Sequence, residues 1–175
     1  MKIPIVNEED EIIKIINADD RKPGEITRIT GIWVGNEKGE VLLAKRAFSK
    51  KRDPGKWGPA AAGSVEEGET YESNALKELE EEIGLKNVKL VKGPKFRRSR
   101  SPEYFAQLFM TIVSSDYPLV KQDAEVEDIK WFSKEELQKL LKEKPELFLP
   151  SVQGTADYFF NYMDQNKELI NAHQN

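Results

Sequence analysis

Three glutamates on one predicted helix carry the strongest chemical signal in this sequence. Glu78, Glu81 and Glu82 stand three and four residues apart, so one helical turn gathers their carboxylates side by side. Like charges at this spacing repel by roughly 0.2–0.5 kcal/mol per pair. A divalent cation among them removes that repulsion and lowers the carboxylate pKa values. The alternative interpretation is an ordinary solvated acidic face, and the segment before the helix argues against it.

That segment predicts a tight loop. Gly63 and Gly68 allow backbone conformations in which a carbonyl can point at a metal, and Glu69 can fold back onto Lys77 across the loop. All metal ligands must be oxygens, because the chain has no cysteine and its single histidine is His173. This excludes a thiol nucleophile, an iron–sulfur cluster and a cysteine zinc site. Oxygen ligands suit Mg²⁺ or Mn²⁺.

Strand patterns come before and after this segment. Hairpins are predicted from residues 3–6 with 11–16, and from residues 25–35 with 40–47. Further strands are expected over residues 88–91, 104–113 and 126–132.

Three helices are predicted. The first begins after Thr70 as N-cap and ends before Gly84. Its expected apolar face consists of Tyr71, Ala75, Leu76, Leu79 and Ile83. Ser133 and Glu136 predict a capping box before the second, and residues 151–170 form the last, after Pro150. Strands with a few helices indicate an α/β or α+β sandwich.

Size and composition limit the class of protein. A chain of 175 residues with 38% hydrophobic and 33% charged residues fits one domain. No apolar run approaches the roughly 18 residues of a membrane span. The first residues lack the apolar core of a signal peptide and cysteine is absent, so we expect a cytoplasmic protein. A net charge of −4 argues against binding a nucleic-acid polymer.

The spacing over residues 63–85 resembles the Nudix box of diphosphate hydrolases. Its pattern is Gly63, five residues, Glu69, seven residues, Lys77-Glu78-Leu79, one residue, Glu81-Glu82, one residue, Gly84-Leu85. The family usually has arginine where Lys77 stands, and lysine lacks the bidentate fork that would grip Glu69. The likeness extends over residues 28–145. DPGKWGPAAAG and LFLPSV further resemble the isopentenyl diphosphate isomerase branch.

This resemblance implies an α/β/α sandwich whose mixed central sheet holds the box helix on one side. We expect a single domain over residues 1–175, with a β-hairpin extension at about 1–27 and a helical extension at about 146–175. The hairpin and the apolar ADYFFNYM segment could form a homodimer surface as readily as cover the core.

The resemblance also implies site roles. Glu78, Glu81 and Glu82 would ligate Mg²⁺ or Mn²⁺ with the carbonyl of Ala62, which precedes the Gly63 corner, and one of the three could accept a proton from the attacking water. Glu69 would hold the loop through Lys77. The family often adds a carboxylate from outside the box as base or ligand. Glu125 is favoured over Glu103 for this, with a plain strand-edge charge as the alternative.

Basic and aromatic residues supply candidates for substrate contact. Arg46 alternates with the expected core residue Leu42, so it could point to the substrate side of the sheet. Trp57 is expected to pin its loop more than to stack on a substrate ring. Further basic candidates are Lys45, Lys50, Lys51, Arg52, Arg97, Arg98 and Arg100, and further core tryptophans are Trp33 and Trp131.

Three functions follow from these residues. The first is a Mg²⁺- or Mn²⁺-dependent hydrolase of a small-molecule diphosphate, such as a nucleoside diphosphate derivative or an organic diphosphate. The second, an isoprenoid diphosphate isomerase, is disfavoured because that class relies on a catalytic cysteine and on histidine ligands. The third is a non-catalytic nucleotide-binding module, against which the intact set of box carboxylates speaks.

Overall fold

The computed structural model describes residues 1–166, so His173 and the end of the predicted stretch over 151–170 lie outside the described residues. The strands are β1 Lys2–Val6, β2 Ile12–Asn17, β3 Thr27–Asn36, β4 Val41–Arg46, β5 Trp57–Pro59, β6 Ala61–Ser64, β7 Val91–Arg98, β8 Tyr104–Val113 and β9 Val126–Phe132. The α-helices are α1 Tyr71–Ile83, α2 Lys134–Glu143 and α3 Pro150–Gln165, and two 3₁₀ turns are η1 Ala18–Asp20 and η2 Pro145–Leu147. No helix among them is long and apolar enough to cross a membrane.

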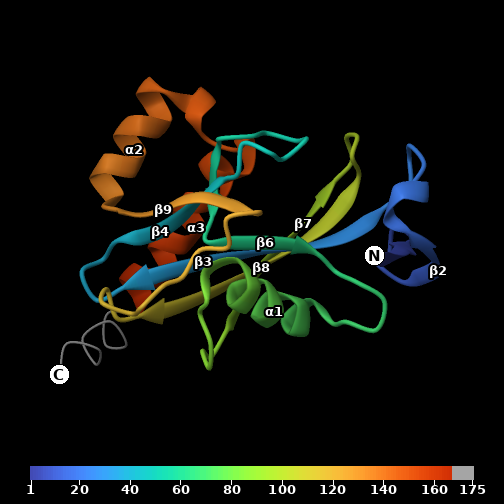
Figure 1. Ribbon diagram of the computed structural model, residues 1–175, viewed down its shortest axis with the longest axis horizontal. Coiled ribbons are helices and arrows are strands. Elements are labelled where there is room, and N and C mark those ends of the chain that lie inside the picture. Colours follow the sequence, from blue (N-terminus) through green and yellow to red (C-terminus); the bar gives the residue numbers. More distant parts are fainter. Residues whose placement is uncertain (167–175) are drawn as a thin grey trace.

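The long strand β3 organises a mixed sheet of seven strands (Figure 1). Along one edge it runs parallel to β8, from the pair Thr27 and Tyr104 to the pair Asn36 and Val113. Along the other edge it pairs first with β6 and then with β4. Strand β4 in turn pairs with β5 and β9. The sheet therefore forks where β4 leaves β3, and the chain crosses that fork as it passes from β5 to β6.

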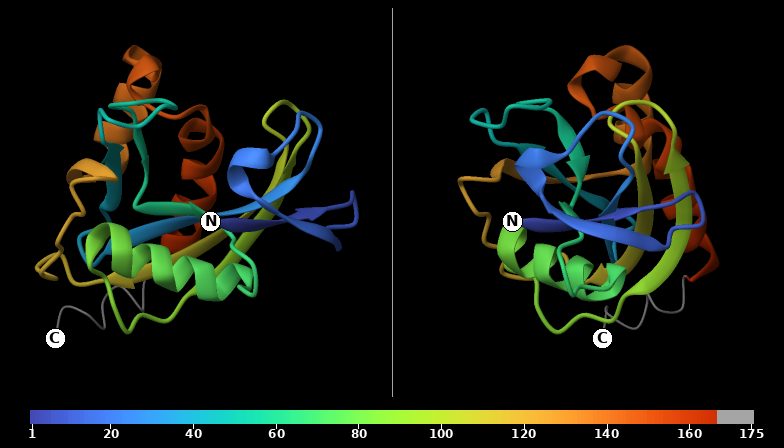
Figure 2. Two further views of the ribbon diagram at one scale, coloured as in Figure 1. Left: turned by 45° about the vertical axis from the view of Figure 1, so that its right-hand side comes forward. Right: turned by 90° about the vertical axis from the view of Figure 1, so that its right-hand side faces the viewer.

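Helices cover both faces of this sheet, as the predicted sandwich requires. Helix α1 packs on one face, where its buried residues Ala75, Leu79 and Ile83 join one apolar cluster. Helices α2 and α3 pack with the opposite face and share a second cluster that contains Trp33, which is 1% exposed. Figure 2 shows these layers from two further directions. The predicted α/β/α architecture is confirmed.

The N-terminal hairpin lies at the end of the sheet opposite α2 (Figures 1 and 2). Strands β1 and β2 pair antiparallel, as predicted, and form a separate two-stranded sheet. The apolar residues of β1 are buried, and the Val6 N–H donates to the carbonyl of Ile26 at 3.0 Å. Most of β2 is exposed.

Three local predictions were wrong. Leu76 is 39% exposed, because the buried stripe of α1 follows the four-residue spacing of the other apolar positions and Leu76 lies off it. The strand predicted over residues 88–91 begins at Val91, where pairing with β8 starts, and continues to Arg98. Only half of the capping box exists: the Ser133 hydroxyl accepts from the Glu136 N–H, but the Glu136 carboxylate binds Lys130 instead.

Candidate functional site

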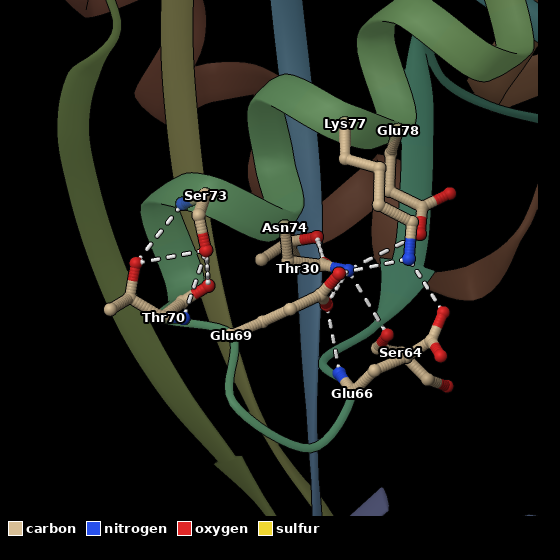
Figure 3. Close-up of polar contacts among 9 residues, drawn as sticks. All are labelled: Thr30, Ser64, Glu66, Glu69, Thr70, Ser73, Asn74, Lys77 and Glu78. Carbon is tan, nitrogen blue, oxygen red and sulfur yellow. Dashed lines mark hydrogen bonds and ion pairs between the residues drawn. The ribbon is translucent and has the colours of Figure 1, made fainter. Parts of the chain in front are cut away.

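Hydrogen bonds and ion pairs among Glu66, Glu69 and Lys77 hold the loop before α1 (Figure 3). The Lys77 ammonium lies 2.9 Å from Glu69 Oε1 and 2.5 Å from Glu66 Oε1. The other carboxylate oxygen of Glu69 accepts from the backbone N–H of Glu66 at 2.9 Å. The predicted pair of Glu69 and Lys77 is therefore present. Glu66 is a second carboxylate partner of Lys77, which sequence reasoning did not predict.

Asn74 ties this loop to the helix and the sheet. It is fully buried, and its Nδ2 donates to Glu69 Oε2 at 2.9 Å, to the Ser64 carbonyl at 3.1 Å and to Glu78 Oε1 at 3.3 Å. Its Oδ1 accepts from the hydroxyl of Thr30 on β3 at 2.5 Å. Sequence reasoning missed Asn74 and Thr30. The available signal was an amide one turn before Glu78, on the helix side that meets the sheet.

Both helix ends are fixed by their own sequence. The Thr70 hydroxyl accepts from the Ser73 N–H, and the Ser73 hydroxyl accepts from the Thr70 N–H, which completes a capping box. At the other end Gly84 adopts a φ of +69°, the left-handed conformation that glycine tolerates best. These caps fix the helical register that places Glu78 and Glu82 one turn apart.

The first of these glutamates packs directly on β6. A Cβ at Gly63 would lie well inside 3 Å of the Glu78 carboxylate, so a larger residue there would displace this side chain from its position. Glu78 is partly buried, and burial is the main cause that raises its pKa. The charge of Lys77 opposes this rise and that of Glu81 adds to it.

The second glutamate is the most perturbed carboxylate of the box. Burial raises the pKa of Glu82 to about 8, and the charge of Glu78 adds to the rise. The opposing contributions are smaller: a backbone N–H from Ala62, 3.4 Å from Oε2, and the charge of Arg46. The charge of Glu125 raises the pKa further. Glu82 is thus a shielded carboxylate whose negative neighbours outweigh its positive ones.

A small cavity of about 50 Å³ opens beside Glu82, in the fork of the sheet. Strand β4 contributes Lys45 and Arg46, and β6 contributes Ala62. Glu125, which precedes β9, and Leu149, which precedes α3, complete the wall. The structure therefore brings together Ala62, Glu82, Arg46 and Glu125, four of the predicted site residues. The Glu125 carboxylate also forms an ion pair with Lys50.

The comparison with known families shows which family the chain belongs to. Residues 26–152 match the model of the NUDIX domain. The chain belongs to the Nudix hydrolase family. A protein named as an uncharacterized Nudix hydrolase, lin0387 of Listeria innocua, is 31% identical over 97% of this chain and 96% of its own length. The crystal structure of DR0079 from Deinococcus radiodurans has a TM-score of 0.71 at 22% identity, covering 82% of this chain and 90% of that one.

The likeness to the isomerase branch is partial. An isopentenyl-diphosphate Delta-isomerase of Corynebacterium diphtheriae is 42% identical over 59 residues, which is 34% of this chain and 32% of that protein. The cysteine on which that class relies is absent from the entire sequence.

Three of the candidate carboxylates, Glu78 and Glu81 of the box and Glu103 outside it, are not part of the cavity wall. Glu81 is exposed, although its charge acts on Glu78. Glu103, the alternative carboxylate, binds Arg97 at 2.6 Å, and Arg97 also binds Glu8 of the N-terminal hairpin. Within residues 1–166, no three histidine, cysteine, aspartate or glutamate side chains are already gathered closely enough to hold a metal ion.

The segment after the Nudix box contributes a residue that sequence reasoning missed. The Leu149 N–H donates to the Trp57 carbonyl at 2.8 Å, and the Leu149 side chain borders the cavity. Trp57 itself meets Phe132 edge to face, with ring centroids 5.2 Å apart. Trp57 therefore anchors both its own loop and the chain before α3, in agreement with the predicted pinning role.

Proposed function

We propose that this Nudix protein is a Mg²⁺- or Mn²⁺-dependent hydrolase that cleaves the diphosphate linkage of a nucleoside diphosphate derivative or a small organic diphosphate. The observation that supports it best is the pair Glu78 and Glu82. These partly buried carboxylates repel each other, and Glu82 lines a small cavity that Lys45 and Arg46 also line. Such a pair is costly without a cation, and perturbed groups of this kind cluster at functional sites.

The residues fit a hard divalent cation. The donors are carboxylate and carbonyl oxygens, which Mg²⁺ and Mn²⁺ prefer. Glu78 and Glu82 would hold the ion with the carbonyl of Ala62, and Glu81, exposed and able to change rotamer, would complete the set. The bound cation would neutralise charge on the diphosphate oxygens and favour attack by water.

Other residues at the cavity would bind the phosphate groups of the substrate and accept the proton of the attacking water. Arg46 and Lys45 would bind phosphate oxygens at the cavity wall. Arg46 is held for this by its Nε, which donates to the Arg52 carbonyl at 3.0 Å. Glu125 would accept the proton of the attacking water from the same wall, and Lys50 would keep that carboxylate oriented.

A hydrolysis screen tests this proposal. The purified protein is incubated with nucleotide sugars, dinucleoside polyphosphates, damaged nucleoside triphosphates and prenyl diphosphates, in Mg²⁺, Mn²⁺ or EDTA, and release of phosphate or nucleoside monophosphate is measured. We expect turnover that requires the metal. Calorimetry should detect Mn²⁺ binding that the double variant Glu78→Gln, Glu82→Gln loses.

The matched control is Glu80→Gln, since Glu80 lies on the same helix but is exposed and paired with Lys86 at 2.8 Å. This variant should bind metal and turn over substrate as the wild type does. Ligand binding without any turnover would support a non-catalytic module instead, and double-bond migration in a prenyl diphosphate would support an isomerase.

A further inference from the structure

The size of the cavity shows that most of a substrate must bind outside it. Pockets that enclose an organic ligand measure roughly 300–1,000 Å³, whereas the cavity beside Glu82 measures about 50 Å³. A phosphate group fits a space of that order, but a nucleoside or a sugar does not. If the proposed function holds, the group attached to the diphosphate lies on the rim.

Phe48 is connected to this cavity through the neighbouring chain and through Lys45. Arg46 lines the cavity, and the next residue, Ala47, donates its N–H to the carbonyl of Glu125 at 2.9 Å. Phe48 follows directly and is 63% exposed. A single exposed apolar residue is ordinary on a protein surface. This one directly follows Ala47, the residue that bonds Glu125 of the cavity wall, and most of its surface faces solvent.

The surrounding loop holds the ring in place. Gly55 has a φ of +71°, and a Cβ there would lie 2.6 Å from Phe48 Cε1. The loop is closed by the Gly55 N–H, which donates to the Arg46 carbonyl at 3.0 Å, and by the Arg46 N–H, which donates to the Lys56 carbonyl at 2.9 Å. The ring therefore rests against a backbone that has no side chain beneath it, yet most of its surface faces solvent.

One side chain, that of Lys45, lies near both this ring and the cavity. Lys45 lines the cavity, and its ammonium lies 5.4 Å from the centroid of the Phe48 ring and 5.9 Å from that of Trp57. A group bonded to a diphosphate that contacts Lys45 is thus within a few ångströms of an exposed aromatic face.

We propose that Phe48 is a stacking platform for the nucleobase of the substrate. The diphosphate lies against Lys45 and Arg46, and the planar base lies on the Phe48 ring. This inference rests on the proposed function and narrows its substrate class to nucleoside diphosphate derivatives. Stacking on an aromatic side chain tolerates any base, because every base has a π-face.

Two probe compounds separate the base from the diphosphate. ADP-ribose carries an adenine, and phosphoribosyl diphosphate has a diphosphate without a base. We expect Phe48→Ala and Phe48→Leu to raise KM for ADP-ribose about tenfold, with kcat nearly unchanged. Both variants should have the wild-type KM for phosphoribosyl diphosphate. Phe48→Trp keeps an aromatic ring and should therefore retain the wild-type KM for ADP-ribose. Phe48→Leu keeps apolar bulk without a ring, so it distinguishes stacking from simple contact.

Tyr158→Ala is the matched control, because Tyr158 is the aromatic residue of α3 that is 50% exposed and stacks edge to face on Phe96, away from the cavity wall. It should change neither KM. Equal effects of Phe48→Ala on both compounds would overturn the platform, as would a wild type that accepts only the base-free diphosphate.

A binding measurement separates this inference from the proposed function. The fluorescence of etheno-ADP-ribose reports stacking of its base without any turnover. We expect wild-type protein to change that fluorescence and Phe48→Leu to abolish the change. Stacking without hydrolysis would reject the proposed function but keep the platform. Hydrolysis of the substrate without a Phe48-dependent fluorescence change would keep the proposed function but reject the stacking platform.

Discussion

The two halves of the Nudix box use the same side chain in opposite ways. In the loop half, Glu69 is surrounded by donors: burial would raise its pKa, but hydrogen bonds from the Glu66 N–H, Lys77 and Asn74 outweigh burial and lower it. In the helix half, Glu82 has few donors, and burial raises its pKa to about 8. The same residue type is therefore a structural tie at one position and a buried carboxyl group with few donors at the other.

Asn74 marks the boundary between the two halves. Its amide donates to Glu69 at 2.9 Å and to Glu78 at the longer distance of 3.3 Å. Donors are thus concentrated on the loop side, and the side that faces the cavity receives few. A carboxylate to which the protein supplies few donors is one that a ligand can partner.

The comparison is tested most strongly by neutralising one carboxylate of each half. Glu82→Gln should lower kcat about 10³-fold, within the range for loss of an acid–base or charge-bearing group. Its free energy of unfolding without metal should stay the same or rise, because glutamine has no charge to desolvate. Glu69→Gln should instead lower the free energy of unfolding by about 2 kcal/mol. Kinetics and urea unfolding of both variants measure this. Equal losses of stability would show that the halves do not differ.

Glu125 combines features of both halves and sharpens the comparison. It shares the cavity with Glu82, yet it has an ion-pair partner in Lys50. If it accepts the proton of the attacking water, Glu125→Gln should lower kcat about 10²-fold and leave KM and the melting temperature nearly unchanged. Steady-state kinetics over a range of substrate concentrations distinguishes these quantities. A variant with wild-type kcat would make Glu125 an ordinary surface charge.

Sequence reasoning succeeded for the local contacts of the box, although it failed for the equally local capping box of Ser133 and Glu136. The pair of Glu69 and Lys77, the Thr70 cap and the Gly84 stop all depend on residues within one loop and one helix, so spacing alone predicts them. The sandwich with a mixed central sheet followed from the family resemblance, but the order of its strands was not predicted.

The missed features depend on residues that are far apart in the sequence. Asn74 meets Thr30 of β3, 44 residues away. Leu149 reaches the cavity only because the chain before α3 returns to Trp57. The different exposures of Glu81 and Glu82 depend on which side of α1 faces β6, and a cluster of glutamates in the sequence does not contain that information.

Lys77 tests whether the loop half also supports catalysis. Lys77→Met leaves Glu66 and Glu69 without their shared cation, so the loop should loosen and kcat should fall about tenfold through misplacement of the box residues. Lys77→Arg restores the charge and adds a bidentate fork, so its kcat should remain near that of the wild type. Kinetics of the two variants at saturating metal gives the answer. A Lys77→Met enzyme with full activity would separate the loop contacts from catalysis.

The smallest expected effect is on stability and concerns Asp10, a carboxylate outside the box that has several hydrogen-bond and ion-pair partners. Its side chain is 10% exposed and binds Arg28 Nε at 2.7 Å, Lys95, and the Tyr71 hydroxyl at 3.1 Å. Burial would raise its pKa, but the hydrogen bonds from Lys95 and Arg28 outweigh burial and lower it. Asp10 has a φ of +63°, which asparagine tolerates, so Asp10→Asn removes the charge with little backbone strain.

Because the pKa of Asp10 is lower in the folded state, its contribution to stability is complete above the unfolded pKa of about 3.9 and is lost as pH falls through the folded pKa. Asp10→Asn should therefore lower the free energy of unfolding by about 1–2 kcal/mol at pH near 7, and the difference from wild type should shrink at strongly acidic pH. Urea unfolding at both pH values measures it, with the exposed neighbour Glu9→Gln as control. A difference that persists unchanged in acid would mean that shape, not charge, holds the hairpin to α1. If kcat of Asp10→Asn equals that of the wild type, the contacts of Asp10 stabilise the fold without a part in catalysis. The carboxylates that matter for turnover would then be those with few donors, Glu78 and Glu82.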